Sequence, residues 1–196
     1  MDLIAKIKQI LFKPDKFFSA LKEKTIQDSL LYYIILLAFN VVMSYLIFLA
    51  FGDFFTKSIL NMLNLNIPLQ SAKEFASVGY YILGYIFGVL FSFAIAAVLF
   101  VWLLIFGGNK GYTKAYQLYV YSETPSLLLK WIPFLNFFTW IYDLVLLIIG
   151  TKKIYNFSAT KAVLIYVIPL TLIFIFLLFM LAASILFLRN TNFGLL

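Results

Sequence analysis

The sequence predicts an all-α integral membrane protein with five transmembrane helices preceded by an amphipathic interfacial helix. Of the 196 residues, 64% are hydrophobic and only 12% are charged, and the mean hydropathy is +1.02. Soluble domains carry roughly a quarter of their residues as charged side chains, so the composition excludes soluble, disordered and fibrous proteins. The charged residues are also spaced widely enough to leave uncharged stretches of membrane-spanning length.

Three of these uncharged stretches are long enough to cross a bilayer without interruption. A helix needs ~20 mainly apolar residues to span ~30 Å of hydrocarbon at 1.5 Å per residue. The stretches contain 24, 35 and 27 residues and predict spans over residues 29–52, 78–106 and 162–188. Gly107-Gly108 ends the second span, and Pro169 kinks the last one near its start.

Two further spans are predicted where charges interrupt an apolar, aromatic stretch. Glu123, Lys130 and Asp143 divide it, and spans over residues 112–129 and 133–150 fit it best. The first of these is short and depends on the snorkelling of its flanking lysines to reach across the bilayer. A re-entrant hairpin is the alternative for this segment.

The distribution of Lys and Arg predicts the orientation, because cytoplasmic loops are enriched in these residues. With five spans, 11 basic residues lie on the amino-terminal side and 4 on the other. The amino terminus is therefore expected in the cytoplasm and the carboxyl terminus outside. A re-entrant third segment changes the count to 10 against 5 with both termini inside. The predicted parts are a cytoplasmic segment 1–28, a five-helix domain 29–188 and a tail 189–196.

The amino-terminal segment has helical periodicity and no signal-peptide pattern. One helical face collects its apolar residues, which are Leu3, Ile4, Ile7, Ile10 and Leu11. Such a helix lies in the headgroup layer with its lysines toward anionic lipid. The lysines assigned to this interface are Lys6, Lys8, Lys13 and Lys16. The alternative is an amphipathic helix that packs on a partner or on the bundle itself.

The second span carries a stripe of small residues. The residues recur every four positions and are Gly84, Gly88, Ser92 and Ala96. Small side chains at this spacing let another helix backbone approach closely, so the stripe predicts a helix-packing seam. The partner is another helix of the same chain or a second protomer, and spacing does not decide between them.

Polar residues line one face of each of the two interrupted spans. We expect them to meet in an intramembrane polar cluster made of Glu123, Asp143, Tyr116, Tyr119, Asn136, Thr139 and Trp140. An ionised carboxylate at membrane depth costs about 2.5 to 3.5 kcal/mol on insertion scales, so each needs donors, protonation or a wet cavity. The cluster is either a proton or cation relay or a structural feature satisfied by its neighbours.

No catalytic, metal-binding or cofactor-binding constellation is apparent in the sequence. It contains neither Cys nor His, which removes disulfides, thiolate chemistry, Ser-His dyads and zincin motifs. Tyr142-Asp143 lacks the second intramembrane aspartate that an aspartyl protease requires. The net charge of +7 is explained by lysines at the ends of spans, so no nucleic-acid partner is expected.

Several short motifs follow one another along the chain in an order that can be compared with that of known families. A basic start contains Lys13-Pro14-Asp15-Lys16-Phe17-Phe18, and the second span ends in Phe106-Gly107-Gly108. Gly111-Tyr112, the stretch from Tyr119 to Pro125, Trp140 and Gly150 follow in order. Taken together, over about residues 5 to 188, this ordered set resembles the Yip domain family of Rab-GTPase-interacting integral membrane proteins.

The resemblance implies a five-helix membrane protein with a cytoplasmic amino terminus. Eukaryotic members act at Golgi and endoplasmic-reticulum membranes, where they bind Rab-type GTPases and one another as adaptors in vesicle traffic. This sequence lacks their long amino-terminal region and their Asp-Leu-x-Gly-Pro-type motif. Its short form, with Pro14 followed by Phe17-Phe18, is similar to the prokaryotic branch, which implies a prokaryotic cell membrane.

Two functions are compatible with these features. The first is a non-enzymatic membrane-organising or trafficking-type scaffold whose partners are the bilayer, anionic headgroups and other membrane proteins or further copies of the chain. The alternative is a small transporter or channel in which Glu123 and Asp143 line a path for protons or cations. Pro125 and Pro169 would then free backbone carbonyls for coordination.

Overall fold

The computed structural model describes residues 2–63 and 78–192, and within them the ordered elements are helices. They belong to two compact units, residues 1–156 and residues 157–196. The first unit contains α1 (Leu3–Phe12), α2 (Pro14–Ser19), α3 (Gln27–Met62), α5 (Val78–Ile105), α6 (Tyr112–Ser122), α7 (Thr124–Leu129) and α8 (Asn136–Tyr155). The second contains α9 (Ala159–Asn192). The last residues of the predicted tail, 193–196, lie outside the described part.

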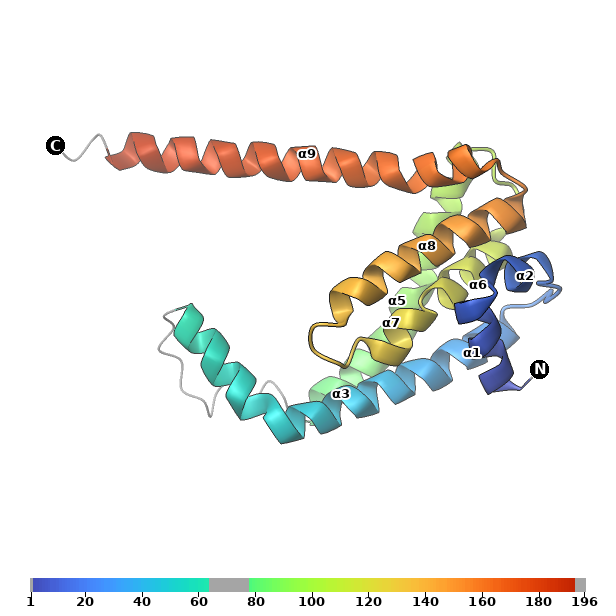
Figure 1. Cartoon of the computed structure of the whole chain (residues 1–196), viewed down its shortest axis with the longest axis horizontal. Coiled ribbons are helices and arrows are strands. Elements are labelled where there is room, and N and C mark those ends of the chain that lie inside the picture. The colour runs from blue at the N-terminus through green and yellow to red at the C-terminus, as the bar shows by residue number, and fades with distance from the viewer. Residues whose placement is uncertain (1, 64–77, 193–196) are drawn as a thin grey trace. The chain divides into compact units, whose positions relative to one another are not determined.

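Three helices are long and apolar enough to cross a membrane, which supports the prediction of a multi-pass helical protein. They are α3, α5 and the stretch of α9 from Ala159 to Ser184. The helix α5 coincides closely with the predicted span 78–106, whereas α3 continues through Asp53 to Met62 and bends in its second half (Figure 1). A charge marks where hydrocarbon ends, but helical hydrogen bonds continue through it into the interface. The predicted first and last spans, 29–52 and 162–188, are therefore shorter than α3 and α9.

The predicted third span, residues 112–129, consists of two helices separated by a single residue. Pro125 has no N–H to give to the carbonyl of Tyr121, and the Thr124 hydroxyl donates to that carbonyl instead at 2.8 Å. Glu123, between α6 and α7, has φ −74° and ψ −1°. Its N–H still reaches Tyr119 O at 3.1 Å, and its carbonyl accepts from Leu127 N at 2.9 Å. The interruption is a local distortion of a nearly continuous helix.

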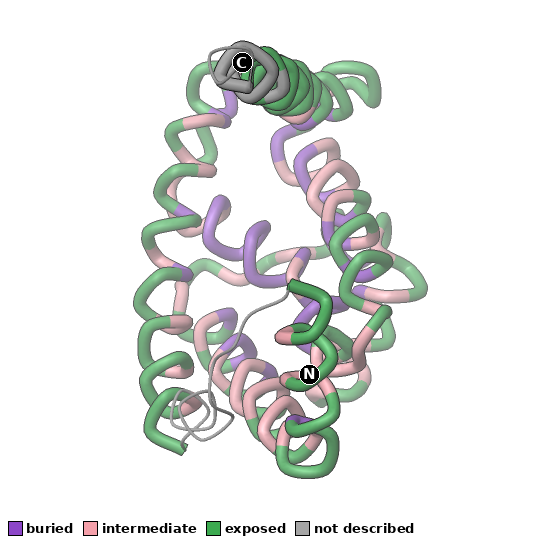
Figure 2. Tube along the Cα trace, turned by 90° about the vertical axis from the view of Figure 1, so that its left-hand side faces the viewer, coloured by how far each residue is buried: buried purple, intermediate pink, exposed green. Residues whose placement is uncertain are grey.

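The pair α6–α7 forms the centre of the first unit. It lies between α3 and α8 and contacts both along its length (Figure 1). Every residue from Ala115 to Ser122 is buried. By contrast, most turns of α3 and α5 are intermediate or exposed, and exposed turns predominate on the outside of the long helices (Figure 2). A helix covered on all sides by protein can hold polar residues that a lipid-facing helix cannot.

The contacts fix the relative directions of these helices. Tyr32 of α3 meets Thr124, and Asn40 meets Ser126 and Leu127, so α6–α7 ascends in the same direction as α3. The helix α8 runs the opposite way, because its early Asp143 reaches Ser126 while its late Gly150 lies against Leu118. Along one level of the bundle, the beginnings of α3 and α6 therefore lie near the end of α8.

Glycines end α5 as the sequence predicts. Gly107 has φ +80°, a left-handed conformation that favours glycine. The N–H of Gly108 returns to Leu103 O at 2.8 Å and satisfies a carbonyl at the end of the helix. Gly111, also left-handed at φ +82°, then precedes α6. The tight connection brings α6 directly alongside α5.

Candidate functional site

The small-residue stripe on α5 packs mainly against other helices of the same chain. A Cβ on Gly88 would lie 2.9 Å from Leu37 of α3. Ser92 lies 3.2 Å from the Tyr116 hydroxyl of α6, and Ala96 is fully buried. Gly84 differs, because a Cβ built there meets nothing within 4 Å. Three of the four seam positions are thus occupied within the first unit, and the fourth is open.

The polar cluster predicted for the two interrupted spans is divided between two neighbourhoods. Asp143 accepts hydrogen bonds from both the N–H of Ser126, at 3.2 Å, and the Ser126 hydroxyl. Tyr116 faces Ser92 of α5, and the Tyr119 ring lies 6.3 Å from the Tyr33 ring of α3. Helical periodicity predicts which residues share a face, but it does not say which neighbour each of them meets.

Two predicted members of the cluster, Asn136 and Trp140, are exposed on α8, and a third, Thr139, bonds within its own helix. Thr139 is buried and donates to Asn136 O in its own helix at 2.8 Å. The Trp140 side chain is 50% exposed, and Asn136 is exposed at the start of α8. The face of α8 that packs against the protein is therefore narrower than predicted, and Asn136 and Trp140 lie outside the cluster.

Glu123 lies at the junction of α6 and α7, half-buried and within electrostatic reach of Asp143 and Lys130. Within residues 2–63 and 78–192, its carboxylate accepts no hydrogen bond. The two carboxylates of the predicted relay are thus neighbours that differ in their bonding. Asp143 is held by Ser126, whereas Glu123 is not held.

The carbonyls of the distorted α6–α7 junction have partners. Asn40 of α3 donates its side-chain N–H groups to Ser126 O at 3.1 Å and to Leu127 O at 3.0 Å. The Thr124 hydroxyl serves Tyr121 O and also lies 2.9 Å from the Tyr32 hydroxyl. The Tyr121 carbonyl, which Pro125 leaves without its helical donor, is therefore satisfied by the Thr124 side chain. Asn40 adds donors to two carbonyls of α7.

A second polar group, not predicted from the sequence, joins the amino-terminal segment to α6. Lys6 of α1 forms an ion pair with Glu23 at 2.6 Å and donates to the Tyr121 hydroxyl at 3.0 Å. The Tyr121 hydroxyl in turn donates to the other oxygen of Glu23 at 2.5 Å. The Lys6 ammonium also lies 4.9 Å from the centre of the Tyr121 ring, close enough for a cation–π interaction.

Lys114 and Gln117 extend this group along α6. Lys114 Nζ donates to Leu21 O at 3.2 Å and to Glu23 O at 2.8 Å, and it also meets Gln117 Oε1 at 2.9 Å. Gln117 Nε2 donates to Glu23 O and to Thr25 O at 3.3 and 3.0 Å. These side chains satisfy carbonyls of the non-helical stretch between α2 and α3. We call Lys6, Glu23, Lys114, Gln117 and Tyr121 the fastening network.

Only part of the fastening network was accessible to sequence reasoning. Lys114, one of the lysines that flank the predicted span 112–129 and were expected to snorkel, donates instead to carbonyls of Leu21 and Glu23. Gln117, fully buried inside a bundle, was the available signal, because a buried amide requires partners. Its partners lie 92 and 94 residues away in the chain, so no local pattern identifies them.

The amino-terminal segment packs on the bundle, the alternative that the sequence left open. Ile10, Phe17 and Phe18 are 0%, 5% and 2% exposed. A Cβ on Gly150 would lie 3.1 Å from the Phe18 ring, which places α2 closely against the end of α8. The Tyr142 hydroxyl of α8 donates to a carbonyl of α1.

One of the four lysines assigned to the lipid interface requires correction. The Lys6 side chain is only 13% exposed and is engaged by Glu23. Its position on the apolar margin of α1 turns it toward the bundle, where Glu23 and Tyr121 compensate its charge. Lys8, Lys13 and Lys16 are exposed, together with Phe12 at 78%. We call these four exposed residues the basic platform.

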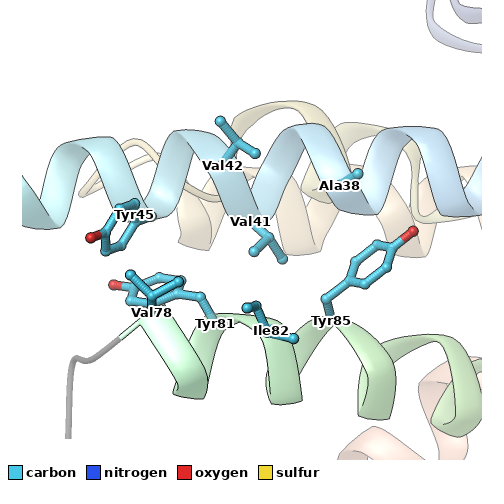
Figure 3. A pocket seen from close by; sticks show the side chains of 8 residues that line it. All are labelled: Ala38, Val41, Val42, Tyr45, Val78, Tyr81, Ile82 and Tyr85. Carbon is cyan, nitrogen blue, oxygen red and sulfur yellow. The ribbon is translucent and has the colours of Figure 1, made fainter.

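Two clefts of the first unit differ in their lining. The α3–α5 groove, of about 300 Å³, is lined by apolar parts of Ala38, Val41, Val42, Tyr45, Val78, Tyr81, Ile82 and Tyr85 (Figure 3). Val41 and Ile82 project into it from opposite helices (Figure 3). The amino-terminal cleft, of about 420 Å³, is lined by Leu3, Lys6, Glu23, Asp28, Leu31, Tyr32 and Ile35. Only the second combines charged and apolar side chains.

Within the described residues, no group of three or more His, Cys, Asp or Glu side chains is arranged to hold a metal ion. The carboxylates of Glu123 and Asp143, predicted from the sequence to lie at membrane depth, line neither of the two clefts described above.

Comparison with known proteins identifies the family. The family model described as the Yip1 domain matches residues 8–181, a range that extends from α1 into α9 and includes the polar cluster and every member of the fastening network except Lys6. No curated protein and no solved structure matches the chain. Because the family model covers most of the chain, this membrane protein belongs to the Yip1 domain family.

Proposed function

We propose that the protein is a non-enzymatic membrane organiser of the prokaryotic cell membrane, a scaffold that presents a rigid cytoplasmic surface to lipid headgroups and to other membrane proteins. The observation that carries the proposal is the basic platform. It stands on helices that are fastened to the bundle by buried contacts, while Lys8, Lys13 and Lys16 remain exposed. Fixed exposed cations attract an anionic leaflet by about 1 kcal/mol each near its surface.

Five spans with a cytoplasmic amino terminus are part of this proposal. The helices α6 and α7 together extend over 18 residues and α8 over 20, or about 27 and 30 Å at helical rise. Their opposite directions beside α3 and α5 support an alternation of crossings. The burial of α6 on every side explains why a span with so many polar residues is tolerated in a bilayer.

Membrane organisation by the basic platform is tested with reconstituted protein. Vesicles of phosphatidylcholine with and without phosphatidylglycerol are prepared at matched protein density, and their diameters are measured by electron cryomicroscopy. We expect the protein to change vesicle size only when the anionic lipid is present. A Lys8→Gln, Lys13→Gln, Lys16→Gln triple variant should lose the effect, whereas Lys57→Gln, on α3 far from the platform, should retain it. An equal effect on both kinds of vesicle would contradict the proposal.

A small proton or cation transporter is the second candidate. It is favoured by Glu123, a half-buried carboxylate that accepts no hydrogen bond from described residues and that lies within electrostatic reach of Asp143. Against it, the carbonyls near Pro125 already have donors in Thr124 and Asn40, so they are not free to coordinate an ion.

Flux measurements separate the two candidates. Purified protein in liposomes is assayed for proton and cation flux, comparing the parent with Glu123→Gln and Asp143→Asn at matched insertion. The scaffold proposal expects no flux above that of empty liposomes. Flux that disappears with either substitution would replace the scaffold by the transporter.

A further inference from the structure

The fastening network does not pair all the charged side chains that line the amino-terminal cleft. Lys6 and Glu23 neutralise one another across 2.6 Å, which leaves the carboxylate of Asp28 as the uncompensated charge of the lining. Asp28 is exposed in the first turn of α3 and accepts no hydrogen bond from the described residues. A ligand that fits this end of the cleft carries a positive group with hydrogen-bond donors.

The opposite charge is also available to a ligand. A lysine ammonium has three N–H donors, and Lys6 uses them on Glu23 and Tyr121. The third donor remains for an anionic oxygen. The cleft thus offers one donor cation and one acceptor anion, a pattern that matches a zwitterion with a phosphate and a primary ammonium.

The apolar part of the cleft continues in the direction of the bilayer. Leu31 and Ile35 follow Asp28 at steps of three and four on α3, so the three share one helical face. Leu31 is 60% exposed and Ile35 is 41% exposed. In a helix that enters the bilayer at its start, the carboxylate lies at headgroup level and these aliphatic side chains lie beside the first part of an acyl chain.

We propose that the amino-terminal cleft binds a phospholipid whose headgroup carries a primary ammonium, such as phosphatidylethanolamine. Asp28 accepts from the ammonium, Lys6 donates to the phosphate, and Leu31 and Ile35 contact the acyl chain. The proposal rests on the proposed function only in treating α3 as a span. It is distinct from the basic platform, which attracts anionic headgroups without selecting an ammonium.

The test uses two lipids of equal net charge, so that the basic platform does not discriminate between them. Full-length protein in detergent is given an equimolar mixture of phosphatidylethanolamine and phosphatidylcholine, and retained lipids are counted by native mass spectrometry. The methylated ammonium of phosphatidylcholine has no N–H to donate to Asp28. We expect phosphatidylethanolamine to be retained roughly fivefold more, which corresponds to the net contribution of one typical hydrogen bond. Equal retention by the parent protein would overturn the proposal.

Matched variants locate the preference in the cleft. Asp28→Asn should reduce the retention ratio to about one, whereas Asp15→Asn, an acidic residue outside the cleft, should leave it unchanged. Thermal unfolding of each variant verifies that the fold is kept, and within residues 2–63 and 78–192 Asp28 makes no hydrogen bond or ion pair on which the fold depends. A ratio that survives Asp28→Asn would overturn the assignment of this carboxylate.

Soluble phosphoethanolamine, added at the same concentration as the lipid, distinguishes a lipid from a free zwitterion. The lipid proposal expects no displacement, because the free headgroup lacks the contacts with Leu31 and Ile35. Displacement at equal concentration would overturn the lipid part. If the protein retains both lipids equally but still changes the size of anionic vesicles, the cleft proposal is refuted and the proposed function stands. If it retains phosphatidylethanolamine preferentially but does not change vesicle size, the proposed function is refuted and the cleft proposal stands.

Discussion

The two ends of the α3–α5–α6 bundle are held together by different interactions. Around the beginning of α3, the fastening network joins residues about 90 positions apart through directional hydrogen bonds. Toward the other end, α3 and α5 meet through apolar side chains and edge-on rings, such as Tyr45 and Tyr81 at 5.1 Å. The first region specifies one arrangement, because each buried polar group requires its partner. The second tolerates change, since lipid can replace an apolar neighbour.

The largest expected effect comes from filling the closest helix contact of the fastened region. Gly150→Val should lower the free energy of unfolding by about 3 kcal/mol, the upper part of the range for overpacking. A Cβ on Gly150 would lie 2.4 Å from Leu118 and 3.1 Å from Phe18. Thermal unfolding in detergent measures the change.

The control for this substitution lies in the apolar region between α3 and α5. Gly84→Ala adds a methyl group where nothing lies within 4 Å, so it should leave stability unchanged or raise it by up to about 1 kcal/mol through helix propensity. A comparable loss at both glycines would contradict the distinction between the two regions.

The next effect concerns the amide that closes the fastening network. Gln117→Met keeps the side-chain length but removes the donors to Glu23 O and Thr25 O. Glu23 O keeps its bond from Lys114, but Thr25 O loses the Gln117 donor, so the free energy of unfolding should fall by about 1 kcal/mol, and hydrogen exchange in the stretch before α3 should become faster. Gln9→Met, at an exposed position of α1, should change neither the free energy of unfolding nor the exchange rate. Unchanged exchange in Gln117→Met would mean that these hydrogen bonds do not hold the segment.

An effect of similar size is expected where α7 meets α8. Ser126→Ala removes the hydroxyl bonded to Asp143 but keeps the backbone N–H at 3.2 Å, so the loss should be about 1 to 2 kcal/mol. A double-mutant cycle with Asp143→Asn should give a coupling energy of at least about 0.5 kcal/mol. Ser58→Ala removes an exposed hydroxyl that bonds only its own helix and is the control. Additive single effects would show that Ser126 does not hold Asp143.

The smallest effect is expected at the surface ion pair of α2 with α8. Asp15 and Lys153 lie 3.0 Å apart, and the Asp15 side chain is 59% exposed. Exposed pairs of this kind contribute less than about 1 kcal/mol and are screened by salt. Asp15→Asn should therefore shift the unfolding temperature by little, and the shift should vanish at high ionic strength. A loss of unfolding free energy as large as that of Gln117→Met would contradict the assignment of this pair to the weak surface interactions.

The long apolar helices could be predicted from the sequence because their signal is local. Spacing between charges located α3, α5 and α9, and Gly107 marked the end of α5 at the observed position. The helical bounds of α3 were too short, since Asp53 lies inside the helix. Charge tells where hydrocarbon ends, and hydrogen-bond geometry tells where the helix ends.

The polar contacts could be predicted only in part. Glu123 and Asp143 were recognised because a charge among apolar residues is unusual. The partner of Asp143 was not recognised, because Ser126 follows a proline and the helical period does not show that it faces α8. Lys6 was assigned to lipid because its partner Glu23 belongs to a non-helical stretch with no pattern of its own. Tertiary packing selects such partners.

The most direct test of the account is the number of crossings, because the scaffold proposal requires α6–α7 to span the membrane. The chain contains no cysteine, so single cysteines introduced at Lys8, Lys57, Asn109 and Lys130 can be labelled with an impermeant maleimide in sealed vesicles of known orientation. We expect Lys8→Cys and Asn109→Cys to react from the cytoplasmic side, and Lys57→Cys and Lys130→Cys from the opposite side. Reaction of Lys130→Cys from the cytoplasmic side would mean a re-entrant hairpin and would contradict the five-span account.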